Sequence, residues 1–166
     1  DVLLHIEDDK ININHLEKRP TYIDFFNFCN INHPNKICIV SNSDIIFTNT
    51  LSHINDNNID NKFLALTRWD LNNTNELTFF NRKDSQDCWI FKSPITFKDT
   101  PDFNLGKPGC DNRIAYMAHD SGLVVTNPSN QIITKHLHNT QIRNYTTNDT
   151  IRGMHMRIIP TNDINI

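Results

Sequence analysis

The sequence predicts an α/β domain with a mixed, mainly parallel sheet flanked by helices. Three apolar runs, at 37–40, 63–67 and 88–91, have the composition of strands. The run at 37–40 is typical of a strand covered on both faces of a sheet, and 63–67 reads as a further buried strand. Segments near 20–28 and 111–119 have the apolar residues and the boundary residues of helices. Strands that alternate with helices along a chain are typical of α/β folds.

The first part of the chain contains one helix and the first of these strands. The apolar run 2–6 is consistent with a buried strand, and the charged, Asn-rich residues 7–19 read as a loop. Pro20 suits the first turn of a helix, whose apolar face would be formed by Tyr22, Ile23, Phe25, Phe26 and Phe28. Pro34, among asparagines, ends this helix before the strand at 37–40.

The rest of the chain repeats the alternation. A turn or short helix at 50–56 and an Asn/Asp-rich loop at 55–62 come first. The remaining strands are predicted, in chain order, at 63–67, 77–80, 88–91 and 123–125. A Pro-Gly pair breaks the chain before the helix at 111–119, and Gly122 caps that helix.

Composition and charge narrow the classes of function. The chain of 166 residues fits a single domain, 1–166. Its net charge is −3, whereas proteins that bind nucleic acids usually carry a positively charged surface, so no nucleic-acid partner is expected. The sequence has no apolar run of roughly 20 residues and opens with no signal segment, so we expect no membrane span and a cytoplasmic location. The four cysteines are not spaced as CxxC, so we expect free thiols rather than a zinc site.

The sharpest local signal is Asn42-Ser43-Asp44, directly after the strand at 37–40. Ligands of open α/β sheets bind beyond the carboxyl ends of the strands, so an acidic group at this place suits a site. A carboxylate with oxygen-bearing neighbours is the kind of group that binds Mg²⁺ or Mn²⁺. The same residue types also cap turns and helices, so a purely structural role is the alternative.

Two more polar pairs flank predicted strands. Arg68 and Asp70 follow one strand, where they form either part of a site or a surface ion pair beside Trp69. Gln86 and Asp87 precede a later strand, where Asp87 either bonds a ligand hydroxyl or caps a turn.

The last candidates lie in the second half of the chain. Asp111, Asn112 and Arg113 open a helix, where a carboxylate is favoured by the helix dipole and could serve simply as a cap. On a strand, His136 and His138 share one face, so both could approach one metal or phosphate, or simply be solvated. Arg143 would be a natural partner for a diphosphate.

Taken in order, these motifs resemble a known series. It comprises Arg19-Pro20-Thr21-Tyr22, Ser41-Asn42-Ser43-Asp44-Ile45, Arg68-Trp69-Asp70, Ser85-Gln86-Asp87-x-Trp89-Ile90-Phe91, Gly109-Cys110-Asp111-Asn112-Arg113, Asn127-Pro128-Ser129, His136-x-His138 and Arg143-Asn144-Tyr145. The series is similar to small GT-A-type glycosyltransferase domains of large DNA viruses and bacteria, including one at the N-terminus of a chlorella-virus multidomain protein. The likeness covers about residues 19–145.

The resemblance implies a GT-A-like, Rossmann-like fold and a metal-dependent glycosyltransferase. Such an enzyme transfers a sugar from a nucleotide-sugar donor, with UDP-sugars as first candidates, to a glycan or protein acceptor. It uses Mn²⁺ or Mg²⁺ and a DxD-type motif, which Asn42-Ser43-Asp44 matches with Asn in the first place. Asp44 and His138 would hold the metal. For a viral protein, the implied location is the host cytoplasm.

The resemblance also suggests a role for each remaining candidate. Asp111 and Asp87 are the catalytic candidates, with Asp111 as the acceptor base and Asp87, like Asp70, holding donor sugar hydroxyls. Arg113 or Arg143 would neutralise charge on the diphosphate. The other donor-binding candidates are Asn42, Ser43, Arg68, Gln86 and Asn112.

The sequence departs from the GT-A pattern at its start, and two other functions are open. GT-A domains begin with a strand and loop that hold the nucleotide base, whereas here only a short apolar run precedes Pro20, so the sequence suggests a domain truncated at its N-terminus. The first alternative is a non-catalytic module that binds nucleotide sugars or carbohydrates. The second is a metal-dependent phosphohydrolase or nuclease that uses Asp44, Asp70 and Asp87.

Overall fold

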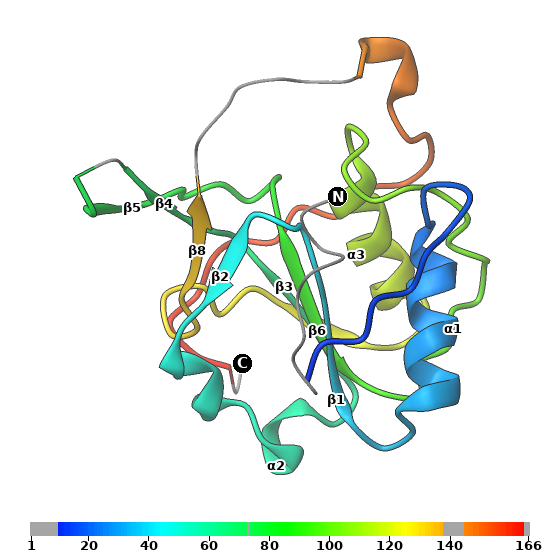
Figure 1. Ribbon diagram of the computed structural model, residues 1–166, viewed down its shortest axis with the longest axis horizontal. Coiled ribbons are helices and arrows are strands. Elements are labelled where there is room, and N and C mark those ends of the chain that lie inside the picture. The colour runs from blue at the N-terminus through cyan, green and yellow to red at the C-terminus, as the bar shows by residue number, and fades with distance from the viewer. Residues whose placement is uncertain (1–9, 73, 138–144, 165–166) are drawn as a thin grey trace.

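The computed structural model describes residues 10–72, 74–137 and 145–164. In chain order the elements are α1 (Tyr22–Asn32), β1 (Ile37–Ser41), β2 (Ile45–Phe47), the 3-10 helix η2 (Asn49–His53), α2 (Asp56–Ile59), β3 (Lys62–Leu66), β4 (Trp69–Leu71), β5 (Leu77–Phe79), β6 (Cys88–Lys92), α3 (Cys110–Asp120), β7 (Val124–Thr126), β8 (Thr134–Leu137) and the 3-10 helix η3 (Thr147–Asp149). Figure 1 shows their arrangement.

The strands form two four-stranded mixed sheets. The first has the order β1-β6-β3-β7 and the second the order β2-β8-β4-β5. In the described ranges only β3·β7 and β4·β8 are parallel pairs, and the other four pairs are antiparallel. The α/β class and the mixed sheet are therefore confirmed, but the expectation of a mainly parallel sheet is wrong. An uninterrupted apolar run carries no information about the direction of a strand. For 37–40 the expected burial of both faces is also wrong, because Ile37 and Ile39 of β1 are 36% and 37% exposed.

Both faces of the central strands β3 and β6 are covered, whereas Ile37 and Ile39 leave one face of the edge strand β1 exposed. Helices α1 and α3 lie on one face (Figure 1), where Phe26 and Ile114 pack against Trp89 and Phe91 of β6. On the other face, Leu64 and other strand residues pack with residues from outside the sheet, namely Ile59, Ile132 and Ile164. Alternate residues of β3 and β6 enter the two cores, which explains why neither strand shows a polar face.

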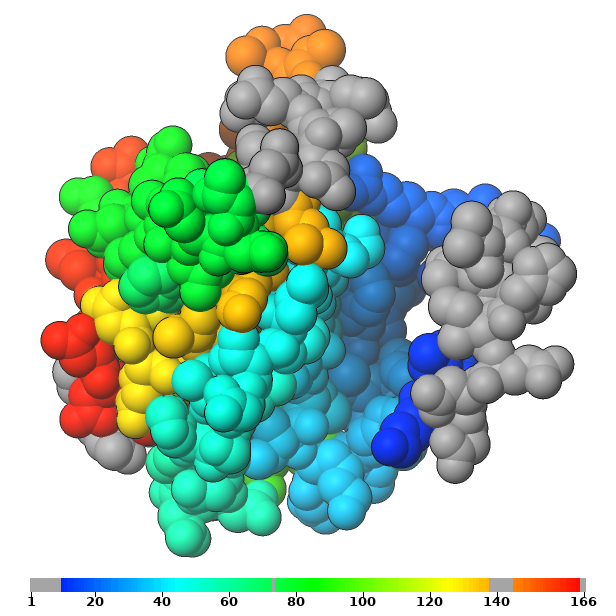
Figure 2. Space-filling model, turned by 60° about the vertical axis from the view of Figure 1, so that its left-hand side comes forward, coloured from blue at the N-terminus to red at the C-terminus, as the bar shows by residue number. Residues whose placement is uncertain are grey.

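The second sheet lies beside the first and is seen from its own side in Figure 2. There β2, β8 and the β4–β5 hairpin lie next to one another, in cyan, orange and green. Strands β2 and β4 were not expected from the sequence, because each follows closely on a predicted strand and overlaps or adjoins a polar motif that was interpreted as the end of that strand. Likewise, the expected loop at 55–62 contains α2 and the start of β3.

Other sequence-based expectations agree with the structure at residue level. The first helix begins at Tyr22 with Thr21 as its N-cap, so Pro20 lies two residues before the helix rather than in its first turn. Gly122 follows the C-cap of α3 with a φ of +93°, a left-handed conformation that favours glycine. All four cysteines are buried free thiols. The predicted strand at 2–6 lies outside the described residues.

Within the described ranges, no helix combines the length and the apolar character that crossing a membrane requires.

Candidate functional site

Two adjoining cavities open at one end of the first sheet. The Asp111 cavity, with a volume of about 550 Å³, is lined by Asp87 and Asp111 among others. The Asp44 cavity, with a volume of about 620 Å³, is lined by Asp44 and Arg19 among others. Because they share the lining residues Asn42, Leu105, Gly106, Lys107 and Tyr145, we describe them together as the groove.

The antiparallel position of β6 explains why the polar pairs meet at this end. Ser41 at the end of β1 and Leu66 at the end of β3 are both paired with Cys88 at the start of β6. Residues that follow β1 and β3 therefore lie beside residues that precede β6. This register brings Asn42 and Arg68 to Asp87.

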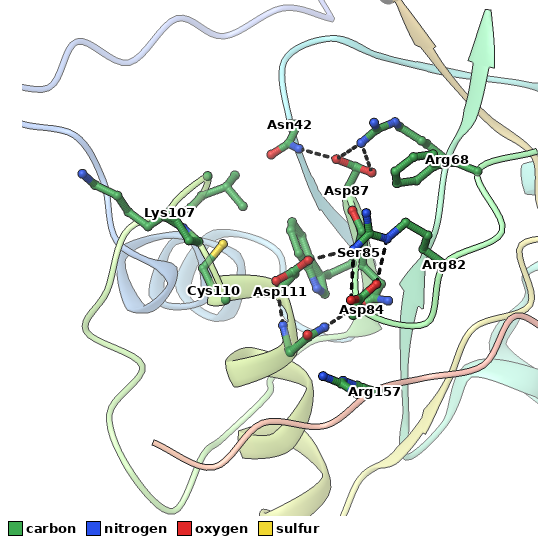
Figure 3. Close-up of a pocket in the computed structure, with 18 of the residues that line it drawn as sticks. Asn42, Arg68, Arg82, Asp84, Ser85, Asp87, Lys107, Cys110, Asp111 and Arg157 are labelled. Atoms are coloured by element: carbon green, nitrogen blue, oxygen red, sulfur yellow. Dashed lines mark hydrogen bonds and ion pairs between the residues drawn. The ribbon is translucent and has the colours of Figure 1, made fainter. Parts of the chain in front are cut away.

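Asp87 is the centre of a short network of polar contacts (Figure 3). Asn42 donates from Nδ2 to Asp87 Oδ1 over 2.8 Å, and Arg68 NH1 lies 3.2 Å from Asp87 Oδ2. The Arg68 guanidinium also donates from Nε to Asp70 Oδ1 over 2.7 Å. Burial raises the pKa of the Asp87 carboxyl, and the charge of Arg68 opposes that rise. With 9% of its side chain exposed, Asp87 mainly orients its two partners.

His136 extends this network to the Asp44 cavity. Its Nδ1 lies 3.1 Å from Asp70 Oδ1 and its Nε2 lies 3.1 Å from Asp44 Oδ2. The contact follows from the parallel pairing of β4 with β8, in which Asp70 and His136 are register partners. His136 was noticed in the sequence but was not chosen as a site residue, because His138 shares its face and spacing alone does not separate them.

Asp111 lies at the start of α3 and has different partners. Its Oδ1 accepts from the backbone amide of Asn112 over 2.9 Å and its Oδ2 from that of Gln86 over 3.2 Å. Asn112 Nδ2 in turn donates to Gln86 Oε1 over 3.2 Å. Burial raises the pKa of the Asp111 carboxyl, and the two amide hydrogen bonds only partly offset it. Asp111 is thus a partly buried carboxyl that lines the groove, and no Lys, Arg or His of the described residues forms an ion pair with it.

Basic side chains line the groove along its length. Lys107 forms an ion pair of 2.8 Å with Asp149, the last residue of η3. The Arg19 guanidinium lies against Gly106, so close that a Cβ at this glycine would be 2.7 Å from Arg19 NH2. The φ of +76° at Gly106 favours glycine, whereas the contact is with the end of a flexible side chain that could move aside. These cations lie in loops and were not identified from the sequence.

Most of the candidate residues from the sequence line the groove, and a few do not. The lining residues among them are Asn42, Ser43, Asp44, Arg68, Gln86, Asp87, Asp111 and Asn112. Asp70 lies behind them, in contact with Arg68 and His136. Arg113 is turned to the C-terminal segment, where its NH1 donates to Met154 O over 3.2 Å. His138 and Arg143 lie outside the described residues.

The metal expected from the sequence can be tested against these side chains. Within the described part of the chain, no three His, Cys, Asp or Glu side chains are grouped so that they could hold a metal ion. Asp44, however, has 48% of its side chain exposed to the Asp44 cavity. Mg²⁺ and Mn²⁺ commonly take one or two protein carboxylates and complete their coordination with substrate phosphates and water. Asp44 fits an ion of that kind, and it does not fit an ion held by the protein alone.

Comparisons with known proteins add no relative. The chain matches no protein-family model, no curated protein and no solved structure. A function must therefore be argued from the groove. Its relevant features are the exposed carboxylate of Asp44, the buried carboxyl of Asp111 and the cations between and around them.

Proposed function

We propose that the chain is a metal-dependent glycosyltransferase that moves a sugar from a nucleotide-sugar donor to a glycan or protein acceptor. The proposal rests on the distribution of charged side chains along the groove. An exposed carboxylate and two cations, Asp44 with Arg19 and Lys107, lie at one end, and the partly buried Asp111 lies at the other. A diphosphate complements the first end, and a reacting hydroxyl complements the second.

The Asp44 end is suited to the donor diphosphate. Arg19 and Lys107 supply positive charge, and Lys107 already binds one carboxylate, that of Asp149, which a phosphate could replace. Asp44 would hold Mn²⁺ or Mg²⁺ together with the donor, and the ion would supply neutralisation of the charge on the leaving diphosphate. UDP-sugars are the first donors to test.

Asp111 is suited to accept a proton from the acceptor. In an inverting reaction the acceptor oxygen bonds to the anomeric carbon, its proton passes to the Asp111 carboxylate, and the bond from the anomeric carbon to the diphosphate oxygen breaks. A base works best when its pKa lies near the working pH, and burial moves the pKa of Asp111 in that direction. Its two backbone amide bonds hold the carboxylate in place.

Asp87 has a positioning role in this scheme. Both of its oxygens are in contact with Arg68 NH1, and Oδ1 also accepts from Asn42. It therefore orients Arg68 and Asn42 toward the donor sugar, while Asp70 and His136 hold Arg68 and Asp44 from behind. The GT-A-like, Rossmann-like assignment belongs to the same proposal, and polar residues beyond β1 and β3 support it.

The test is Mn²⁺-dependent release of nucleotide from a panel of UDP-sugars by purified protein. We expect Asp44→Ala to abolish this release while its melting temperature stays near that of the wild type, because Asp44 is half exposed. Asp102→Ala, at an exposed carboxylate outside the groove, is the matched control and should keep full activity. Unchanged turnover by Asp44→Ala with Mn²⁺ present would reject the metal role.

The two alternatives give different results in the same assay. A binding module would be stabilised by the donor without releasing nucleotide. A phosphohydrolase or nuclease would hydrolyse simple phosphodiesters to an alcohol and a phosphomonoester. The structure favours the hydrolase less, because Arg68 and His136 separate Asp44, Asp70 and Asp87 instead of leaving them to converge on one ion.

A further inference from the structure

The far end of the Asp111 cavity carries two arginines and one aspartate. Arg82, Asp84 and Arg157 all line this cavity, and we call the two arginines the basic rim. In Figure 3, Asp111 lies between Lys107 on one side and Asp84 with Arg157 on the other. The basic rim is thus placed beyond the proposed base, away from the end assigned to the donor.

The basic rim has one more positive charge than its partner can balance. Arg82 binds Asp84 through two parallel contacts, Nε to Oδ1 over 2.9 Å and NH2 to Oδ2 over 3.0 Å. This pairing lowers the pKa of Asp84, and the charge of Arg157 adds to the effect. Among the described residues no acidic side chain forms an ion pair with Arg157. One carboxylate therefore stands between two guanidinium groups.

The backbone holds Arg157 in position on both sides. Met156 N donates to Asn112 O over 2.9 Å, and Ile158 N donates to Lys83 O over 2.8 Å. The first bond joins the segment to α3 beside Asp111, and the second joins it to the loop that carries Arg82 and Asp84. The backbone of Arg157 is thus fixed at the wall of the cavity, and its exposed side chain lines that cavity.

We infer that the acceptor is an acidic sugar, whose carboxylate binds at the basic rim while one of its hydroxyls faces Asp111. The inference rests on the proposed function, because it assigns the acceptor of the same reaction. A second carboxylate would balance the two arginines, and the planar guanidinium matches a carboxylate with two hydrogen bonds. A neutral sugar would leave the two arginines to share the single carboxylate of Asp84.

A matched pair of ligands tests this directly. Methyl β-D-glucuronide and methyl β-D-glucoside differ only in the carboxylate at C6, and NMR titration gives the Kd of each. We expect wild-type protein to bind the glucuronide roughly three- to fivefold more tightly at low salt, as for a half-exposed ion pair. Arg157→Gln should remove this preference. Arg152→Gln, at an exposed arginine of the same segment that does not line the cavity, should retain it.

Several results would overturn the inference. These are equal affinity for the two glycosides, no measurable binding of the glucuronide, or a preference that survives Arg157→Gln. Displacement of the glucuronide by UDP with Mn²⁺ would also overturn it, because the basic rim would then belong to the donor. Mn²⁺-dependent binding of UDP-sugars and their hydrolysis, in which water takes the sugar, are measured without any glycoside, so the absence of both would reject the proposed enzyme independently of the glycoside result.

Discussion

Asp111 combines two opposing environments, a buried position that disfavours its charge and two amide donors that favour it. The net effect is a raised pKa, so the folded protein binds a proton more tightly than the unfolded chain does. The contribution of this proton to the free energy of unfolding is fully present below the ordinary pKa of an aspartate. It is lost as the pH rises through the raised pKa of Asp111. Catalysis needs the opposite protonation state, so stability and activity should respond to pH in opposite directions.

Asp111→Asn tests both responses. Its free energy of unfolding relative to the wild type should improve as the pH is raised from about 4 to 7, by about 1.4 kcal/mol for each unit of pKa shift, because Asn cannot ionise. Transfer should fall by roughly 100- to 10,000-fold. Urea unfolding at several pH values, with turnover at pH 7, gives both numbers. A relative stability that stays constant across this pH range would contradict the assignment.

At the scale of elements, a buried polar cluster joins the ends of β3 and β7. Asn127 is fully buried; its Nδ2 donates to Thr67 Oγ1 over 2.9 Å and to Ile158 O over 3.2 Å. Its Oδ1 accepts from Ser129 Oγ, and the Thr67 hydroxyl is 3.0 Å from both Arg82 O and Ser85 O. The cluster therefore fixes the loop 82–85, which carries Arg82 and Asp84 of the Asp111 cavity.

Asn127→Ala should lower the free energy of unfolding by about 2–4 kcal/mol, because several buried groups lose their partners at once. Asn130→Ala is the control: this residue is exposed and contributes its backbone amide, which donates to Thr161 O. Its effect should stay within about 0.5 kcal/mol. Chemical denaturation of both variants measures the difference, and similar values for the two would contradict the role of the cluster.

The position of single strands could be predicted from the sequence, but their pairing could not. Apolar runs identified β3 and β6, and polar residues at their ends identified Asp87 and Arg68, because burial and strand ends leave local patterns. Strand direction and register leave none, and here they decide which groups meet. His136 belongs to the network because β8 is parallel to β4, a pairing between segments more than 60 residues apart.

At the scale of the whole molecule, the C-terminal segment ties the groove to both cores. Ile151 N donates to Pro108 O over 2.9 Å, Thr161 N donates to Asn127 O over 2.7 Å, and Ile164 is buried beneath the first sheet. Between these points the segment carries Ile158, which belongs to the core on the α1 and α3 face. One stretch of irregular chain thus contributes to two cores and to one wall of the groove.

Adjacent isoleucines test this role. Ile158 is 6% exposed and Ile159 is 69% exposed. Ile158→Ala should lower the free energy of unfolding by about 2–4 kcal/mol, whereas Ile159→Ala should change it by less than about 0.5 kcal/mol. Thermal and urea unfolding of the two variants provide the comparison. If both were equally mild, the segment would not be part of the folded core.

The place of β6 between β1 and β3 has a consequence for the synthesis of the protein. β1 and β3 do not pair with each other. Each of them pairs with β6, which follows both in the chain. As the chain leaves the ribosome from its N-terminus, Asn42, Asp44 and Arg68 emerge before the strand that unites their own strands. The nascent chain therefore exposes two apolar strands until residue 92 has emerged, and a chaperone that binds such strands would meet this protein during that interval.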